Sequence, residues 1–274
     1  GTIEVGLFLS NRDVEELEKD PNLGVAWFGS TLQAEVIFNT RVGPTADPKV
    51  RKALRLAYDY DGGLSVVRRG KGSMANGPLP QGIICRPDLP KVSRNVEEAK
   101  KLLAEAGQTN LSLKLFFQPV FDAQKQEATL YQANLRDIGV QVELVPIAFP
   151  SYLASLADPN SIPPMMLLED FAQYPDPGIM LTKGYRSDAV GSNRAGYANP
   201  EVDKLLDEAG TTIDDEARCK LYEKVQQILD ADSVMVDMYT LQRSAVFNKA
   251  RVTGVQPSPH VTPIAPAALR LVAE

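Results

Sequence analysis

The residues with the clearest potential for binding chemistry follow a short apolar segment, residues 165–168, which we interpret as a strand. Behind it the chain offers the carboxylate of Asp170, the amide of Gln173, and the aromatic rings of Phe171 and Tyr174. In open α/β sheets, ligands lie beyond the carboxyl ends of the strands. We therefore predict that these four side chains contact a small ligand.

Part of this loop can be explained by helix capping instead of ligand binding. Asp176 followed by Pro177 matches a helix N-cap with proline at the first helical position. Tyr174 would then pack against that helix. We favour the capping role for Asp176 and Pro177, and we leave both roles open for Gln173.

Two other segments supply further candidates for ligand contact. Phe117 is one of them, together with its neighbour Phe116 and with Tyr152, although packing in the core is the favoured interpretation of all three. Arg186 and Asn193 belong to a polar loop that is able to face a cleft, with a solvated loop as the favoured alternative.

The sequence offers no pattern for a metal, a cofactor or catalysis. Its single histidine, His260, cannot form a histidine-based metal site alone. It contains no phosphate-binding loop, dinucleotide fingerprint or Gly-x-Ser-x-Gly elbow. Acidic pairs occur near the first turns of predicted helices, where the helix dipole accounts for them: Glu15-Glu16, Glu97-Glu98 and Asp214-Asp215. We expect a protein that is not an enzyme.

Composition narrows the class of protein further. The chain has 274 residues, 44% of them hydrophobic, and a net charge of −6, which argues against a nucleic-acid surface. No apolar run is long enough to span a bilayer. The chain starts at Gly1 without a secretory signal, so we expect a cytosolic protein or a mature or truncated piece of an exported one. For Cys85 and Cys219 we favour two unpaired thiols over a disulfide.

Helix and strand signals alternate through the middle of the chain. Caps and apolar periodicity predict helices that begin near Asp47, Asn95, Asp122, Asn199 and Asp214. Gly107 is predicted to end the helix that begins near Asn95, and Gly139 the helix that begins near Asp122. We expect strands over residues 111–117, 140–147, 165–168 and 233–241. The strand–helix–strand order over residues 111–147 is typical of a βαβ unit with parallel strands, and this predicts an α/β fold.

The two ends of the chain differ from this middle region. Residues 1–33 contain a predicted strand, an acidic helix and the segment around Trp27. Residues from about 244 onward are strand-like and then rich in proline. Neither end forms a closed domain on its own.

The order of motifs resembles the peptide- and nickel-type solute-binding proteins of ABC importers, known as extracellular solute-binding protein family 5. The resemblance covers nearly the whole chain. The matching segments are Gly1-Thr2-Ile3-Glu4-Val5, the helix Val50-Arg51-Lys52-Ala53-Leu54, the turn Gly77-Pro78-Leu79-Pro80, the helix end Leu102-Leu103-Ala104-Glu105-Ala106-Gly107, the helix-to-strand element Ile138-Gly139-Val140-Gln141-Val142, and the two turns Tyr174-Pro175-Asp176-Pro177 and Tyr197-Ala198-Asn199-Pro200.

This resemblance implies the C-terminal half of a two-lobed protein that closes on a ligand by hinge motion. The second lobe would comprise residues 34–240, a type II periplasmic-binding-protein-like mixed sheet flanked by helices. Residues 1–33 and 241–274 would supply strands of a mostly missing first lobe. The implied protein is periplasmic or extracytoplasmic and monomeric, binds no nucleic acid, and delivers a small solute to an ABC permease in the membrane.

The resemblance also indicates what kind of solute to expect. Dipeptide-binding members carry an aspartate for the ligand's ammonium group and an arginine for its carboxylate. At the matching positions this chain has Gln173 and Gln118. Because amides suit neutral polar groups, we expect an extended oligopeptide held by its backbone, a saccharide or an opine-like solute. Asp170 is the nearest source of a displaced negative charge.

Two other functions are alternatives to transport. A sensory or regulatory protein can use the same lobe. A hydrolase acting through two acidic residues of the cleft is a weaker alternative, because no feature of the sequence places two carboxylates together.

Overall fold

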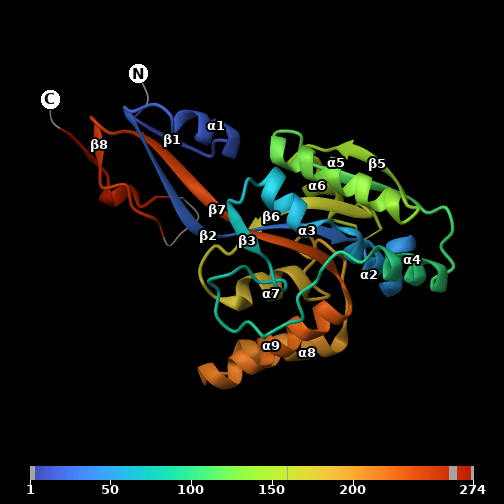
Figure 1. Ribbon diagram of the computed structural model, residues 1–274. Helices are drawn as coiled ribbons and strands as arrows, with labels where there is room; N and C mark the ends of the chain where they lie inside the picture. The colour runs from blue at the N-terminus through green and yellow to red at the C-terminus, as the bar shows by residue number, and fades with distance from the viewer. Residues whose placement is uncertain (1–3, 159, 259–263, 273–274) are drawn as a thin grey trace.

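A mixed seven-stranded sheet organises the molecule, which is seen here in a computed structural model that describes residues 4–158, 160–258 and 264–272 (Figure 1). The strand order is β1-β7-β2-β6-β4-β5, and β3 also pairs with β7. The strands are β1 (Val5–Leu7), β2 (Leu23–Phe38), β3 (Gly72–Met74), β4 (Ser112–Phe117), β5 (Gln141–Pro146), β6 (Met165–Phe171) and β7 (Met235–Asn248). A separate antiparallel pair consists of β8 (Val252–Thr253) and β9 (Arg270–Leu271).

The helices begin where the sequence places their caps. The side chains of Asp47, Asn95, Asp176, Asn199 and Asp214 each accept a hydrogen bond from a backbone N–H in the first turn. The helices are α1 (Asn11–Leu17), α2 (Pro48–Ala57), α3 (Tyr60–Gly62), α4 (Val96–Glu105), α5 (Asp122–Asp137), α6 (Phe149–Ser155), α7 (Pro177–Tyr185), α8 (Pro200–Thr211) and α9 (Asp215–Ala231). Shorter helical turns are Pro44–Ala46, Gly63–Val67 and Pro266–Ala268.

The predicted βαβ unit is confirmed. Strands β4 and β5 pair in parallel, with Ser112 opposite Gln141 and Phe117 opposite Pro146. Helix α5 connects them. Gly107 and Gly139 follow α4 and α5 with φ of 68° and 83°, the left-handed conformation that ends a helix and that glycine adopts without strain.

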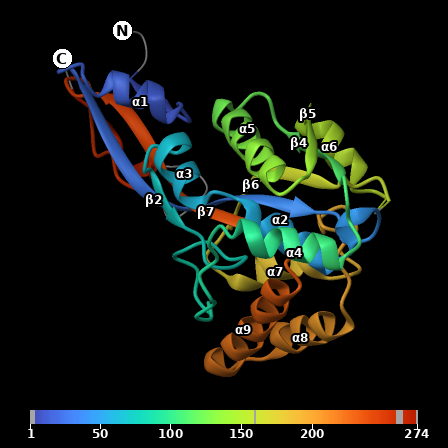
Figure 2. The same ribbon diagram turned by 45° about the vertical axis from the view of Figure 1, so that its right-hand side comes forward.

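Helices cover both faces of the sheet and produce two apolar cores. One core lies under α2, α4 and α5, and contains Leu54, Leu103 and Tyr131. The other lies under α6, α7, α8 and α9, and contains Leu181, Val225 and Leu229. Figures 1 and 2 show α8 and α9 on the side of the sheet away from α5. The predicted α/β class is therefore confirmed.

Two strands run well beyond this two-faced unit. The β2–β7 ladder is continuous from Ile37 opposite Met235 to Leu23 opposite Asn248, apart from shifts in register between Gly29 and Gln33 and at Ala34. Its far end carries β1, α1 and the β8–β9 pair (Figure 1). We call the stretch of β2 and β7 between the two-faced unit and this far end the neck, residues 26–33 and 240–245.

A buried ion network attaches α1 to the two-faced unit. The Arg68 guanidinium donates two hydrogen bonds of 2.7 Å to Glu127 in α5 and one of 2.8 Å to Glu169 in β6. The carbonyl oxygen of Arg68 accepts a 2.9 Å hydrogen bond from Asn11 in α1. Because one residue bonds to α5, β6 and α1, this network fixes how the far end meets the sheet.

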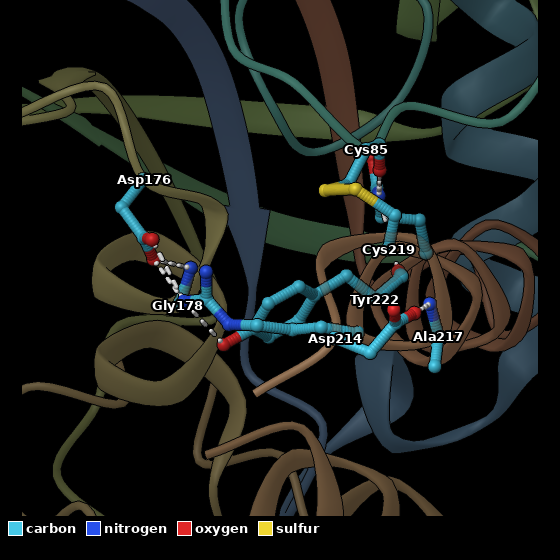
Figure 3. Close-up of a disulfide and its surroundings, with 9 residues drawn as sticks. Cys85, Asp176, Gly178, Asp214, Ala217, Cys219 and Tyr222 are labelled. Carbon is cyan, nitrogen blue, oxygen red and sulfur yellow. Dashed lines mark hydrogen bonds and ion pairs between the residues drawn. A yellow bond between two sulfur atoms is a disulfide. The ribbon is translucent and has the colours of Figure 1, made fainter. Parts of the chain in front are cut away.

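The two cysteines form a disulfide, so our expectation of unpaired thiols was wrong. Cys85 belongs to the long loop before α4 and Cys219 to α9, and their Cα atoms lie 4.6 Å apart (Figure 3). Nothing in the spacing of 134 residues predicts this approach. It arises because Gln226, two turns further along the same face of α9, donates a 2.6 Å hydrogen bond to the Cys85 carbonyl and so docks the loop on that helix.

Reducing this disulfide should destabilise the protein by about 2–5 kcal/mol, because the bond closes a long loop in the unfolded chain. Thermal unfolding with and without reductant measures the effect. A double variant, Cys85→Ser with Cys219→Ser, should match the reduced protein and should not respond to reductant. Equal melting temperatures for the oxidised and reduced protein would contradict this assignment.

Candidate functional site

The carboxyl ends of the parallel strands meet at one edge of the sheet, which we call the carboxyl edge. Strand β4 pairs with β6 only through Leu115 opposite Met165 and Phe116 opposite Met166. Beyond this point β6 continues through residues 167–171, paired on one side with β2. Within the described part of the chain no strand pairs with its other side. Residues 167–171 therefore present an open strand edge.

Exposed apolar side chains follow the carboxyl ends of these strands, in loops and at the start of α6. Val120 and Phe121 lie between β4 and α5 with 77% and 45% of their surface exposed, and Phe149, just after β5, is 39% exposed. Tyr174, after β6, is 50% exposed. Large exposed apolar groups at the same end of neighbouring strands make this end of the sheet a candidate binding surface. Sequence reasoning identified Tyr174 but missed the other three, whose position behind predicted strands was the available signal.

The structure places Gln118 and Gln173 at different heights along the sheet. Gln118 directly follows β4, is 8% exposed, and its backbone N–H donates to the Gln124 side chain at 3.0 Å. Continuing the β4–β6 register puts Gln118 level with Leu168. Gln173 is exposed and lies two residues beyond the end of β6, five residues after Leu168. The two amides therefore follow two neighbouring strands, β4 and β6.

Asp170 is already paired with cations. Its carboxylate lies 3.1 Å from Arg194 and 3.7 Å from Lys183. It also accepts a hydrogen bond from the backbone N–H of Phe171, which ends β6 and is half-buried. The role of Asp170 as a counter-charge for a ligand stays a prediction. A cationic group of the ligand would compete with Arg194 and Lys183 for this carboxylate.

The remaining predicted contacts lie away from the open edge or are engaged elsewhere. Phe117 and Tyr152 are buried in the two cores, as the favoured interpretation held. Arg186 forms ion pairs with Asp188 and Asp207 on the surface. The Asn193 amide is buried and bonds the backbone of Arg186 and Tyr197. Ligand contact by these four residues stays a prediction that the geometry does not favour.

Asp176 has the structural role that we favoured. It caps α7 through a 2.7 Å hydrogen bond from the Gly178 N–H and forms an ion pair with Arg218 of α9 (Figure 3). This pair holds the start of α7 against α9, beside the disulfide.

A small polar cavity lies on the α7 side of the sheet, next to Asp170. Its volume is about 30 Å³, enough for a water molecule or two, and Glu35, Asp170, Lys183, Ser192 and Arg194 line it. Glu35 is 4% exposed, and no described residue donates a hydrogen bond to its carboxyl group. Burial, followed by the nearby Asp170 charge, raises the pKa of Glu35 to about 8. The cavity thus contains an acid that is protonated near neutral pH.

Metal binding and membrane spanning find no support in the described ranges. No group of three potential metal-ligating His, Cys, Asp or Glu side chains occurs among those residues. No helix in the same ranges is long and apolar enough to cross a bilayer. His260 lies outside the described residues.

The sheet order, the two helical layers and the neck define a class of protein, the type II periplasmic binding proteins. The same fold occurs in a periplasmic binding protein, DppA, from Helicobacter pylori in complex with the peptide STSA, with a TM-score of 0.87 and 23% identity over 98% of this chain and 52% of that one. AppA from Bacillus subtilis, in complex with a nonapeptide, also gives 0.87, with 22% identity over 99% of this chain and 56% of that one.

This chain belongs to the bacterial extracellular solute-binding proteins, family 5, whose middle-region profile matches residues 1–192. It is 31% identical to heme-binding protein A of Haemophilus influenzae over 84% of this chain and 43% of that protein. It is 27% identical to probable di/tripeptide-binding protein 5 of Pseudomonas aeruginosa, over 87% and 46%. The chain thus spans less than half the length of these relatives, and the family resemblance is confirmed.

The protonated Glu35 makes stability depend on pH in a defined direction. Its folded pKa lies above its ordinary value of 4.5, so the folded state holds the proton more tightly and stability falls as pH rises from about 4.5 through 8. Burial also raises the pKa of Asp237 to about 6, so Glu35→Gln should remove the dependence between about pH 6 and 8. The variant should be about 2–4 kcal/mol more stable than the native protein at pH 8, with little difference at pH 4.5. Denaturant unfolding across this range measures it.

The exposed Glu143 of β5 provides the control. Glu143→Gln should leave the pH profile unchanged. A native profile that is flat from pH 4.5 to 8 would show that Glu35 is ionised in the folded protein.

Proposed function

We propose that this chain forms one lobe and the neck of the substrate-binding component of an ABC importer, and that its ligand is an extended peptide. Residues 34–240 are the second lobe, and residues 1–33 and 241–274 contribute to the first. The ligand lies between the lobes, and its contacts with both favour the closed form, which docks on a membrane permease.

The observation that carries the proposal is the open edge at residues 167–171 of β6. A strand edge offers alternating N–H and C=O groups, and an extended peptide satisfies them by adding as a further strand. The exposed apolar groups of Val120, Phe121 and Phe149 follow β4 and β5 at the same end of the sheet and are available to side chains of the peptide. A saccharide or an opine-like solute would leave the strand edge unused.

Two further features agree with this function. The disulfide is typical of oxidising compartments outside the cytoplasm, which supports a periplasmic or extracytoplasmic location. The family comprises solute-binding proteins, and its members include dipeptide- and oligopeptide-binding proteins. We therefore propose binding and release without catalysis.

Backbone recognition predicts a specific loss on N-methylation. In the full-length protein, a hexapeptide should bind with micromolar or better affinity, and methylating the backbone nitrogens that face β6 should weaken binding by about 10-fold or more, because each methyl group removes a donor and blocks the edge. Methylating the intervening nitrogens should have little effect. Calorimetric titration separates the two sets. Binding that is insensitive to methylation, or hydrolysis of the peptide, would refute the proposal.

The amides at Gln118 and Gln173 predict poor binding of free dipeptides, because the charges of such a ligand find no partner there. The double variant Gln118→Arg with Gln173→Asp should gain affinity for extended peptides that carry both terminal charges. Gln141→Asp, at the exposed start of β5, is the control and should gain none. Tight, salt-insensitive binding of free dipeptides by the native protein would remove the hypothesis of a neutral ligand at these two points.

A further inference from the structure

We propose that Arg243, in the neck, binds a carboxylate of the captured ligand and thereby selects for acidic solutes. The inference rests on the proposed function, since it places the ligand between the lobe and the far end of the β2–β7 ladder. It adds a charge to the expected ligand: a carboxylate at the neck, with neutral groups at Gln118 and Gln173.

Arg243 differs from the other enclosed arginines in having no polar partner. Arg55 is paired with Asp230 and Asp237, Arg68 with Glu127 and Glu169, and Arg218 with Asp176. Arg243 is half-buried, and no described residue forms an ion pair or a hydrogen bond with its guanidinium. Its guanidinium carbon lies over the ring of Phe8, 5.1 Å from the ring centroid.

The position of Arg243 is that of a ligand contact. It lies on β7 opposite Phe28 of β2, on the far-end side of the register shift that begins at Gly29. Phe28 lies four residues along β2 from Leu32, which pairs with Phe171 at the end of β6, so Arg243 follows the carboxyl edge along the ladder. The charge of Glu169 also acts on Arg243. A group in the neck beside that edge lies where a peptide along residues 167–171 would end.

Glu169 does not neutralise this cation. Its carboxylate accepts a 2.8 Å hydrogen bond from Arg68, which is shared with Glu127. Accordingly, burial is the larger influence on Arg243 and lowers its pKa, against the opposing effect of Glu169. Arg243 therefore loses solvation without gaining a protein counter-charge.

A carboxylate is the group that best compensates this loss. The guanidinium has donors in a planar fork that match the two oxygens of a carboxylate. The guanidinium carbon lies over the ring of Phe8, a contact that supplies no carboxylate or carbonyl acceptor for the N–H groups. A ligand that brings a carboxylate to the neck gains a charge-assisted hydrogen bond that no described residue of this chain makes.

The test compares two forms of one peptide in the full-length protein. A hexapeptide of alternating valine and serine, N-acetylated, is prepared with a C-terminal carboxylate or carboxamide, and a second pair carries aspartate or asparagine at one end. We expect the acidic member of at least one pair to bind about 10-fold more tightly than its neutral partner, a difference typical of a charge-assisted pair.

Arg243→Gln should abolish this preference while changing the affinity for the neutral peptide less than about 2-fold, and Arg243→Lys should retain part of it. Arg136→Gln removes the same charge from an exposed position at the end of α5 and should leave the preference intact. Thermal unfolding without ligand shows whether each variant is folded.

The outcomes separate the two proposals. If no hexapeptide binds, peptide capture itself is refuted. If acidic and neutral peptides bind the native protein equally, or if Arg243→Gln weakens both members of a pair alike, peptide capture stands and the role of Arg243 is refuted. The native comparison needs no variant, so a misfolded substitution leaves the test decisive.

Discussion

The antiparallel ladder between β2 and β7 is the constraint on which the other features depend. These two strands belong both to the two-faced sheet and to the far end that carries β1 and α1. Their backbone hydrogen bonds therefore join the two regions without a flexible linker. The shifts in register at Gly29 and Ala34 interrupt the ladder where it leaves the sheet. Because such irregularities bend a strand and increase its twist, they set the direction of the neck.

Buried charge is handled in two ways on the two faces of the sheet. On the α5 side, Arg68 meets two carboxylates with good geometry, so the cost of desolvation is offset within the protein. On the α7 side, Glu35 lies beside Asp170 and is neutralised by protonation instead. Arg243 has neither solution among the described residues. Of these three groups, Arg243 is therefore the one whose charge is left for a ligand to neutralise.

Local signals in the sequence predicted most of the elements. Caps such as Asp47 and Asn199, and stops such as Gly107, act within a few residues, and these helices begin and end as expected. The βαβ unit followed from periodicity alone. Contacts between distant segments were not readable in this way. The pairing of Cys85 with Cys219 and of Asp170 with Arg194 depends on how loops and helices dock, which spacing along the chain does not encode.

Sequence reasoning chose candidate residues for the site but not their surroundings. The strand-end rule selected the loop after β6, but it could not show that β6 extends beyond its pairing with β4 and leaves an edge open. Nor could it separate Gln173, which is exposed, from Asn193, whose amide is fully used by the backbone. Burial and hydrogen bonding in three dimensions decide which polar residues remain available.

The unpaired side of β6 also has a cost that is independent of transport. A strand edge that pairs with no described strand is a template on which another copy of the chain can add a strand, and exposed rings such as Phe121 and Phe149 follow the neighbouring strands. Under the proposed function, the ligand and the first lobe would cover this surface and keep it from self-association. A binding protein of this design is most vulnerable to aggregation while it is empty and open.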